Sequence, residues 1–201
     1  ETAPDSIYEE PINDQEDLLG IVNPSLKRPF DVREVISRIA DGSRFEEFKP
    51  LFGPTIICGF MKIHGHTVGV LGNNGSLFPD SSQKAAHFIQ LCNQISIPLV
   101  FLQNITGFNI GKEFEQNGSI KKGAQMLNAV SNSEVPHLTV ILGNSYGAGT
   151  YAMSGREFGN AFTFLWPTAK IAVMGGEQIA GVMSMVRLSL IHISEPTRPL
   201  Y

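Results

Sequence analysis

The segment most informative about the fold is Leu138-Thr139-Val140-Ile141-Leu142, followed by Gly143-Asn144-Ser145-Tyr146-Gly147-Ala148-Gly149-Thr150. The first five residues predict a buried strand, and residues 151–155 can continue as a helix. The backbone N–H groups of a first helical turn have no partner in the helix and carry the positive end of its dipole. Small residues leave these groups uncovered, so the turn is suited to an oxygen that gains negative charge. The alternative is a tight turn that needs glycine only for close packing.

Outward from this segment, strands and helices alternate. After an initial hairpin, this alternation predicts an α/β fold with mainly parallel strands, whose sites lie at the carboxyl ends of the strands. The expected elements in the first half are a helix from Asp31 to Gly42, strands 55–63 and 68–71 around a turn at Gly65, a helix from Asp80 or Ser81, and strand 98–102. They are followed by a loop 103–118, a helix with Ile120, Ala124, Leu127 and Val130 on one face, strands 162–165 and 171–173, and a helix 177–185.

Composition narrows the class of protein. The 201 residues are 42% hydrophobic, enough for one substantial core, and the net charge is −4. Scattered basic residues predict neither a nucleic-acid partner nor an anionic membrane surface, and no apolar run approaches the ~20 residues that span a bilayer. Cys58 and Cys92 lack the spacing of metal ligands and are predicted to be buried thiols in a reducing compartment.

The two ends of the chain differ from the middle. Residues 1–20 are acidic and contain two prolines, so we expect an extended linker. From about Leu188 the sequence loses its helical pattern and resembles translated sequencing-adapter DNA, so residues 188–201 are excluded from the fold as a non-native tail. The domain is therefore expected over residues 21–187.

Two further loops can face a ligand. Gln103-Asn104-Ile105-Thr106-Gly107-Phe108 follows a buried strand, where Gly107 allows close backbone approach and Phe108 can form an apolar wall. Gly175 and Gly176 mark a second strand-to-helix junction. There is no P-loop and no Cys/His metal set, and the histidines are dispersed without an obvious Ser or Cys partner. A side-chain nucleophile therefore has little support.

Several runs together resemble the C-terminal half of the carboxyltransferase (beta) subunits of methylcrotonoyl-CoA carboxylases. They keep the order of that family over about residues 18 to 186. The matching runs are residues 26–36 (LKRPFDVREVI), 41–45 (DGSRF), 70–75 (VLGNNG), 101–108 (FLQNITGF), 143–149 (GNSYGAG), and 166–167 with 175–178 (WP and GGEQ). The resemblance implies a crotonase-like (ClpP/crotonase) ββα superhelix, joined through residues 1–20 to an N-terminal carboxyltransferase domain outside this sequence and truncated at its C-terminal end.

The resemblance also implies a reaction. In this family a carboxyl group moves from carboxybiotin to the γ-carbon of 3-methylcrotonyl-CoA, giving 3-methylglutaconyl-CoA in leucine degradation, and the C-terminal half receives the biotin. On this basis the amides of Ala148 and Gly149 form an oxyanion hole for the biotin ureido oxygen, and the domain needs no metal. The residues expected to bind biotin are Gly107, Phe108, Tyr146 and Gly147, and those expected to shape the acyl-CoA pocket are Thr106, Gly175 and Gly176.

The implied partners are a biotin-carrying alpha subunit, further beta subunits in dimers within an α6β6-type assembly, and an acyl-CoA. The implied compartment is the mitochondrial matrix in a eukaryote and the cytoplasm in a bacterium. The alternatives are a geranyl-CoA or propionyl-CoA carboxylase beta subunit, a crotonase-type hydratase or isomerase, and a non-catalytic assembly domain. An acidic residue within reach of the Ala148 amide would favour the hydratase, and a side chain that blocks this amide would favour the assembly domain.

Overall fold

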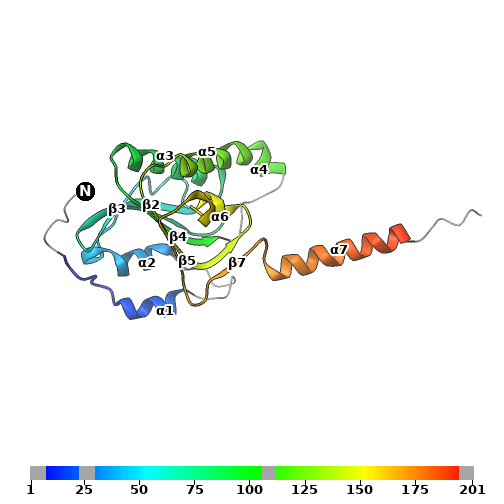
Figure 1. Cartoon of the computed structure of the whole chain (residues 1–201), viewed down its shortest axis with the longest axis horizontal. Helices are drawn as coiled ribbons and strands as arrows, with labels where there is room; N and C mark the ends of the chain where they lie inside the picture. Colours follow the sequence, from blue (N-terminus) through cyan, green and yellow to red (C-terminus); the bar gives the residue numbers. More distant parts are fainter. Residues whose placement is uncertain (1–7, 23–29, 106–111, 195–201) are drawn as a thin grey trace, which may run out of the picture.

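The computed structural model describes residues 8–22, 30–105 and 112–194 (Figure 1). Its strands are β1 (Glu46–Glu47), β2 (Ile56–Ile63), β3 (His66–Asn73), β4 (Leu99–Ile105), β5 (His137–Tyr146), β6 (Phe162–Leu165) and β7 (Lys170–Ala172). Its α-helices are α1 (Leu18–Ile21), α2 (Val32–Ile39), α3 (Pro79–Gln94), α4 (Lys112–Gln116), α5 (Ser119–Ser131), α6 (Gly149–Ala152) and α7 (Gly176–Ser194). Short 3-10 turns are η1 (Gln15–Asp17), η2 (Asp41–Ser43) and η3 (Arg156–Phe158).

The strands form one sheet in the order β1-β2-β3-β4-β5-β6, with β7 beside the end of β5. Pairing is antiparallel from β1 to β3 and parallel from β3 onward, which confirms the predicted hairpin followed by parallel strands. Strand β5 pairs with β6 along residues 138–141 and with β7 along residues 144–146. The carboxyl end of β5 is therefore enclosed by β4 and β7.

Two apolar clusters cover the two faces of the sheet. Helices α3 and α5 pack on one face and α2 on the other (Figure 1). Phe88 and Ile89 of α3 and Phe101 of β4 are fully buried in the first cluster, and Val35 and Ile36 of α2 lie in the second. Because β4 is covered on both faces, its residues 99–102 form a continuous buried apolar run rather than an alternating one.

The hairpin between β2 and β3 has a carboxylate beneath it. His64 and Gly65 both have positive φ, 48° and 79°, as a tight hairpin turn requires. Asp41, which is buried, accepts hydrogen bonds from the amides of His64 (2.8 Å) and Gly65 (2.7 Å). The carboxylate thus satisfies both turn amides and fixes the turn.

Several sequence predictions were wrong in detail. Residues 15–21 are helical rather than extended, and the Asp14 side chain accepts from the Glu16 amide at the start of η1. Part of the predicted loop 103–118 is regular, since β4 reaches Ile105 and α4 follows from Lys112.

Helix α5 is rotated relative to the prediction. Ile120 is 75% exposed, because the face against α3 is formed by Gly123, Met126, Ala129 and Val130. The last helix is also longer than predicted, since the backbone of α7 continues through Ser194 and past residue 188. It extends away from the sheet (Figure 1).

Candidate functional site

The turn after β5 presents two backbone amides. Gly147 has φ +62° and its amide donates to Ala172 O at 3.2 Å, so β7 uses this donor. Ala148 follows with helical φ and ψ of −65° and −19°, and α6 begins at Gly149. Within the described residues, the amides of Ala148 and Gly149 have no hydrogen-bond acceptor. Ala148 is exposed, so its amide can meet a ligand oxygen, whereas Gly149 is buried directly after it.

A buried polar group supports the turn from beneath. The Gln103 side chain is fully buried and its Nε2 donates to Met153 O at 2.6 Å, just after α6. Ser145 Oγ donates to Gln103 Oε1 at 2.9 Å and lies 2.9 Å from Thr150 Oγ1. These contacts join β4, the end of β5 and α6, so they fix the direction in which the first amides of α6 point.

Asparagine side chains join the carboxyl ends of the three central strands. Asn73, at the end of β3, donates from Nδ2 to Asn104 O (2.6 Å) and accepts at Oδ1 from the Asn104 amide (2.8 Å). Asn104 in turn accepts at Oδ1 from the Asn144 amide of β5 (3.0 Å). Sequence reasoning named the segments that contain these residues and Gln103 but gave their side chains no role. The available signal was that a polar amide directly follows each apolar strand run.

A cavity of about 690 Å³ lies beside the turn. Its lining is mixed, with apolar residues of β5 to β7 and the polar residues of η3. The lining includes Gln103, Thr139, Ile141, Thr150, Arg156, Glu157, Thr163, Leu165 and Ile171. Since Gln103 and Thr150 also support the turn, the cavity and the two amides belong to the same region.

The structure brings together part of the predicted site. Tyr146, Gly147, Ala148 and Gly149 are consecutive at the end of β5, with Tyr146 buried. Val173 O lies 3.3 Å from the position of a Cβ on Gly147, so the chain after β7 passes beside the turn. Gly175 precedes α7 and Gly176 is its first residue, and neither is hydrogen-bonded to the amides of Ala148 and Gly149. Thr106, Gly107 and Phe108 lie outside the described residues.

The buried histidine is at the other end of β5. His137 Nδ1 lies 3.0 Å from Ser154 Oγ and Nε2 lies 2.6 Å from Ser133 Oγ, and burial lowers the pKa of His137. In the described part of the chain, no group of three or more His, Cys, Asp or Glu side chains is placed to hold a metal ion. No helix there is long and apolar enough to cross a membrane. Both cysteines are buried and free, and burial raises the pKa of Cys92 to about 12.

Comparison with known proteins gives one consistent family. A family model described as "Carboxyl transferase domain" matches residues 1–192. The probable mitochondrial methylcrotonoyl-CoA carboxylase beta chain of Drosophila melanogaster is 58% identical over 92% of this chain and 32% of its own length. The chain thus spans about a third of that relative.

Solved structures of related proteins also superpose closely on this chain. The beta subunit of geranyl-CoA carboxylase from P. aeruginosa superposes with a TM-score of 0.87 at 49% identity, over 92% of this chain and 36% of that one. The transcarboxylase 12S subunit gives a TM-score of 0.82 at 36% identity, over 90% of this chain and 36% of that one. The predicted α/β crotonase-like fold is therefore confirmed, and the chain belongs to the carboxyl transferase domain family.

Proposed function

We propose that this chain supplies the biotin-facing half of the active site in the carboxyltransferase subunit of a biotin-dependent acyl-CoA carboxylase. The observation that carries the proposal is the pair of consecutive amides at Ala148, which is exposed, and Gly149, which is buried. They follow β5 and have no acceptor among the described residues. Membership in the carboxyl transferase domain family supports the same chemistry.

The turn fits a biotin ureido group. When bound, biotin supplies the carboxyl group to be transferred, and its ureido oxygen gains negative charge as that group leaves. The Ala148 and Gly149 amides donate to this oxygen, and one such donor contributes about 3–4 kcal/mol to a transition state. Gly147 adds no side chain at the turn, and we place Tyr146, Gly107 and Phe108 around the biotin. Thr106, Gly175 and Gly176 are proposed to shape the acyl-CoA side.

The acyl substrate that we propose is 3-methylcrotonyl-CoA, which the reaction converts to 3-methylglutaconyl-CoA. The 58% identity to a methylcrotonoyl-CoA carboxylase beta chain supports this choice. Geranyl-CoA is the second candidate, because the geranyl-CoA carboxylase beta subunit is 49% identical and superposes closely.

The proposed assembly follows from the same relatives. We propose an alpha subunit that carries the biotin, and copies of this subunit assembled into an oligomer. The transcarboxylase 12S structure is described as a hexamer assembly, which supports association of like subunits. In a eukaryote the proposed compartment is the mitochondrial matrix, as the name of the Drosophila relative states for that protein. In a bacterium it is the cytoplasm.

Two features favour carboxyl transfer over the alternatives. A hydratase or isomerase would be favoured by a carboxylate at the Ala148 amide, and no such hydrogen bond exists within residues 8–22, 30–105 and 112–194. Glu157 lines the neighbouring cavity from η3 and is exposed. An assembly domain would be favoured by a blocked amide, and Ala148 is exposed.

The test uses a complete subunit that carries this sequence, together with its biotin-bearing partner, ATP and labelled bicarbonate. We expect label in 3-methylcrotonyl-CoA in preference to geranyl-, propionyl- and acetyl-CoA. Ala148→Pro removes one amide donor at a residue whose φ of −65° already suits proline, so kcat should fall by about 100-fold or more. Ala148→Ser keeps the amide and is the control.

The other possible outcomes of this test would change or refute the proposal. Near-normal turnover by Ala148→Pro would remove this turn from the mechanism. Preference for another acyl-CoA would keep the mechanism and change the substrate. Absence of carboxylation with every acyl-CoA would refute the proposed function in favour of the hydratase or the assembly domain.

A further inference from the structure

We infer that Asn104 is a positioning residue for carboxyl transfer, because its side chain accepts a hydrogen bond from a bulge in β5 that ends at Asn144, four residues before Ala148. The inference rests on the proposed function of the Ala148 and Gly149 amides. Asn104 itself touches neither amide, so its effect passes through the backbone of β5.

The bulge is visible in the strand register. Gln103 of β4 pairs with Ile141 of β5, and the next pair is Ile105 with Ser145. Strand β4 therefore advances two residues while β5 advances four, and Leu142, Gly143 and Asn144 all face Asn104. Bulges redirect a strand and leave backbone groups unpaired within the ladder. Here the Asn144 amide donates instead to Asn104 Oδ1 at 3.0 Å.

The fit over the bulge is close. A Cβ placed on Gly143 would lie 2.5 Å from Asn104 Oδ1 and 3.1 Å from its Cγ. No side chain therefore fits at residue 143 while Asn104 holds the Asn144 amide. The glycine and the asparagine form one unit, and a change in either one displaces the same hydrogen bond.

Asn73 holds Asn104 in turn. Its side-chain amide makes two hydrogen bonds with the backbone of residue 104, one as donor (2.6 Å) and one as acceptor (2.8 Å). A third bond from Asn73 Nδ2 to Gly75 O (2.9 Å) ties the group to the loop after β3. Asn73 is 1% exposed, so loss of these bonds would leave buried polar groups unpaired.

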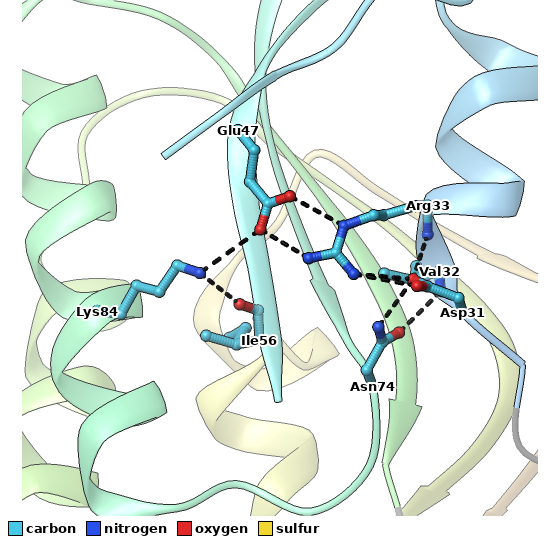
Figure 2. Close-up of polar contacts among 7 residues, drawn as sticks. All are labelled: Asp31, Val32, Arg33, Glu47, Ile56, Asn74 and Lys84. Atoms are coloured by element: carbon cyan, nitrogen blue, oxygen red, sulfur yellow. Dashed lines mark hydrogen bonds and ion pairs between the residues drawn. The ribbon is translucent and has the colours of Figure 1, made fainter. Parts of the chain in front are cut away.

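The adjacent asparagine faces the other way and provides a matched control. Asn74 accepts at Oδ1 from the Val32 amide (2.7 Å) and donates from Nδ2 to Asp31 Oδ1 (2.8 Å), at the start of α2 (Figure 2). It makes no recorded contact with Asn104 or Asn144. Asn74→Ala should therefore weaken the attachment of α2 without moving the bulge.

The experiment compares steady-state kinetics of the complete subunit with its biotin-bearing partner for the wild type, Asn104→Ala, Gly143→Ala, the double variant and Asn74→Ala. We expect Asn104→Ala and Gly143→Ala each to lower kcat by about 10- to 100-fold, the size of effect that a small misplacement produces, with the KM for acyl-CoA changed by less than about threefold. The double variant should be no slower than the worse single variant, because both changes break one hydrogen bond. Asn74→Ala should keep kcat within about twofold.

Hydrogen exchange gives a second readout on the same samples. The Asn144 amide should exchange at least tenfold faster in Asn104→Ala and Gly143→Ala than in the wild type, and should be unchanged in Asn74→Ala. If Asn104→Ala does not fold, Gly143→Ala and its exchange carry the test. A kcat within twofold of wild type for a folded variant that has lost the Asn144 protection would overturn the inference. The inference would also be overturned if the reductions in kcat from Asn104→Ala and Gly143→Ala multiplied in the double variant.

The two proposals can fail separately. If Ala148→Pro is inactive and Asn104→Ala is fully active, the inference fails and the proposed function stands. If the wild type carboxylates no acyl-CoA, the proposed function fails and takes the inference with it.

Discussion

Glu47→Gln should destabilise the fold strongly, because it leaves a buried lysine without its anionic partner. Lys84 of α3 is fully buried, and its Nζ lies 3.9 Å from Glu47 Oε1 and donates to Ile56 O at 2.9 Å (Figure 2). Arg33 binds the same carboxylate through Nε at 2.9 Å and Nη2 at 2.8 Å. Burial lowers the pKa of Lys84, and the nearby Glu47 carboxylate is one of the groups that oppose this shift.

The magnitude follows from the distances and the exposure of each partner. At 3.9 Å and an effective dielectric constant of about 20, the attraction between Lys84 and Glu47 is about 4 kcal/mol. The Arg33 side chain is 38% exposed, so its pair with Glu47 adds no more than about 1 kcal/mol. Glutamine keeps an acceptor for Arg33, and Lys84 keeps Ile56 O. We therefore expect a loss of about 3 kcal/mol, near the lower end of the range for breaking a buried ion pair.

The assay is equilibrium unfolding in urea at pH 7, with the free energy of unfolding compared between variants. Glu46→Gln is the control, because Glu46 is the exposed neighbour on β1. Lys84→Met in the Glu47→Gln background should recover at least half of the lost stability, because it removes the uncompensated charge. A loss below 1 kcal/mol for Glu47→Gln, or no recovery in the double variant, would refute the reasoning.

Two further predictions concern the hairpin and the buried histidine. Asp41→Ala should lower the free energy of unfolding by about 2–4 kcal/mol, since it removes the acceptor for the His64 and Gly65 amides, and Asp41→Asn should lie between it and the wild type in the same unfolding assay. Burial lowers the pKa of His137 in the folded protein, so the unfolded chain binds a proton at this histidine more readily. The stability that the neutral histidine contributes is therefore fully present above about pH 6.5 and is lost as the pH falls through the lowered pKa. His137→Gln should therefore lose less stability than the wild type between pH 7 and pH 5; an identical pH dependence would contradict this account.

The order of elements was predictable, because it depends on local patterns. The alternation of apolar runs and amphipathic segments predicted the hairpin, the parallel strands and the helices between them. The face of α5 was not predictable in the same way. Its sequence contains two overlapping apolar stripes, and packing against α3 selects the one that includes Gly123 and Met126 and leaves Ile120 exposed.

The candidate site was predictable to the extent that it is local. Gly147, Ala148 and Gly149 are consecutive, and small residues after an apolar run indicate an open strand-to-helix turn. The contacts of Gln103 with Ser145 and of Asn104 with Asn144 join residues about 40 positions apart. They depend on the parallel register of β4 and β5 and on the bulge within it, which no periodicity in the sequence encodes. The network around Lys84 was missed for the same reason, since its members come from α2, β1, β2 and α3.

A site made of backbone amides has to be tuned through the residues that hold the backbone. Its donors cannot be exchanged by substitution, so their direction depends on neighbouring side chains that accept or donate to the main chain. Gln103 and Asn104 are adjacent on β4; the first bonds to Met153 O just after α6 and the second to the Asn144 amide before the turn. The turn between them is thus fixed at both ends by one strand. Under the proposed function, differences in the rate of carboxyl transfer among members of this fold should therefore arise at the side chains equivalent to Gln103 and Asn104. Differences in acyl-CoA preference should arise in the walls of the pocket.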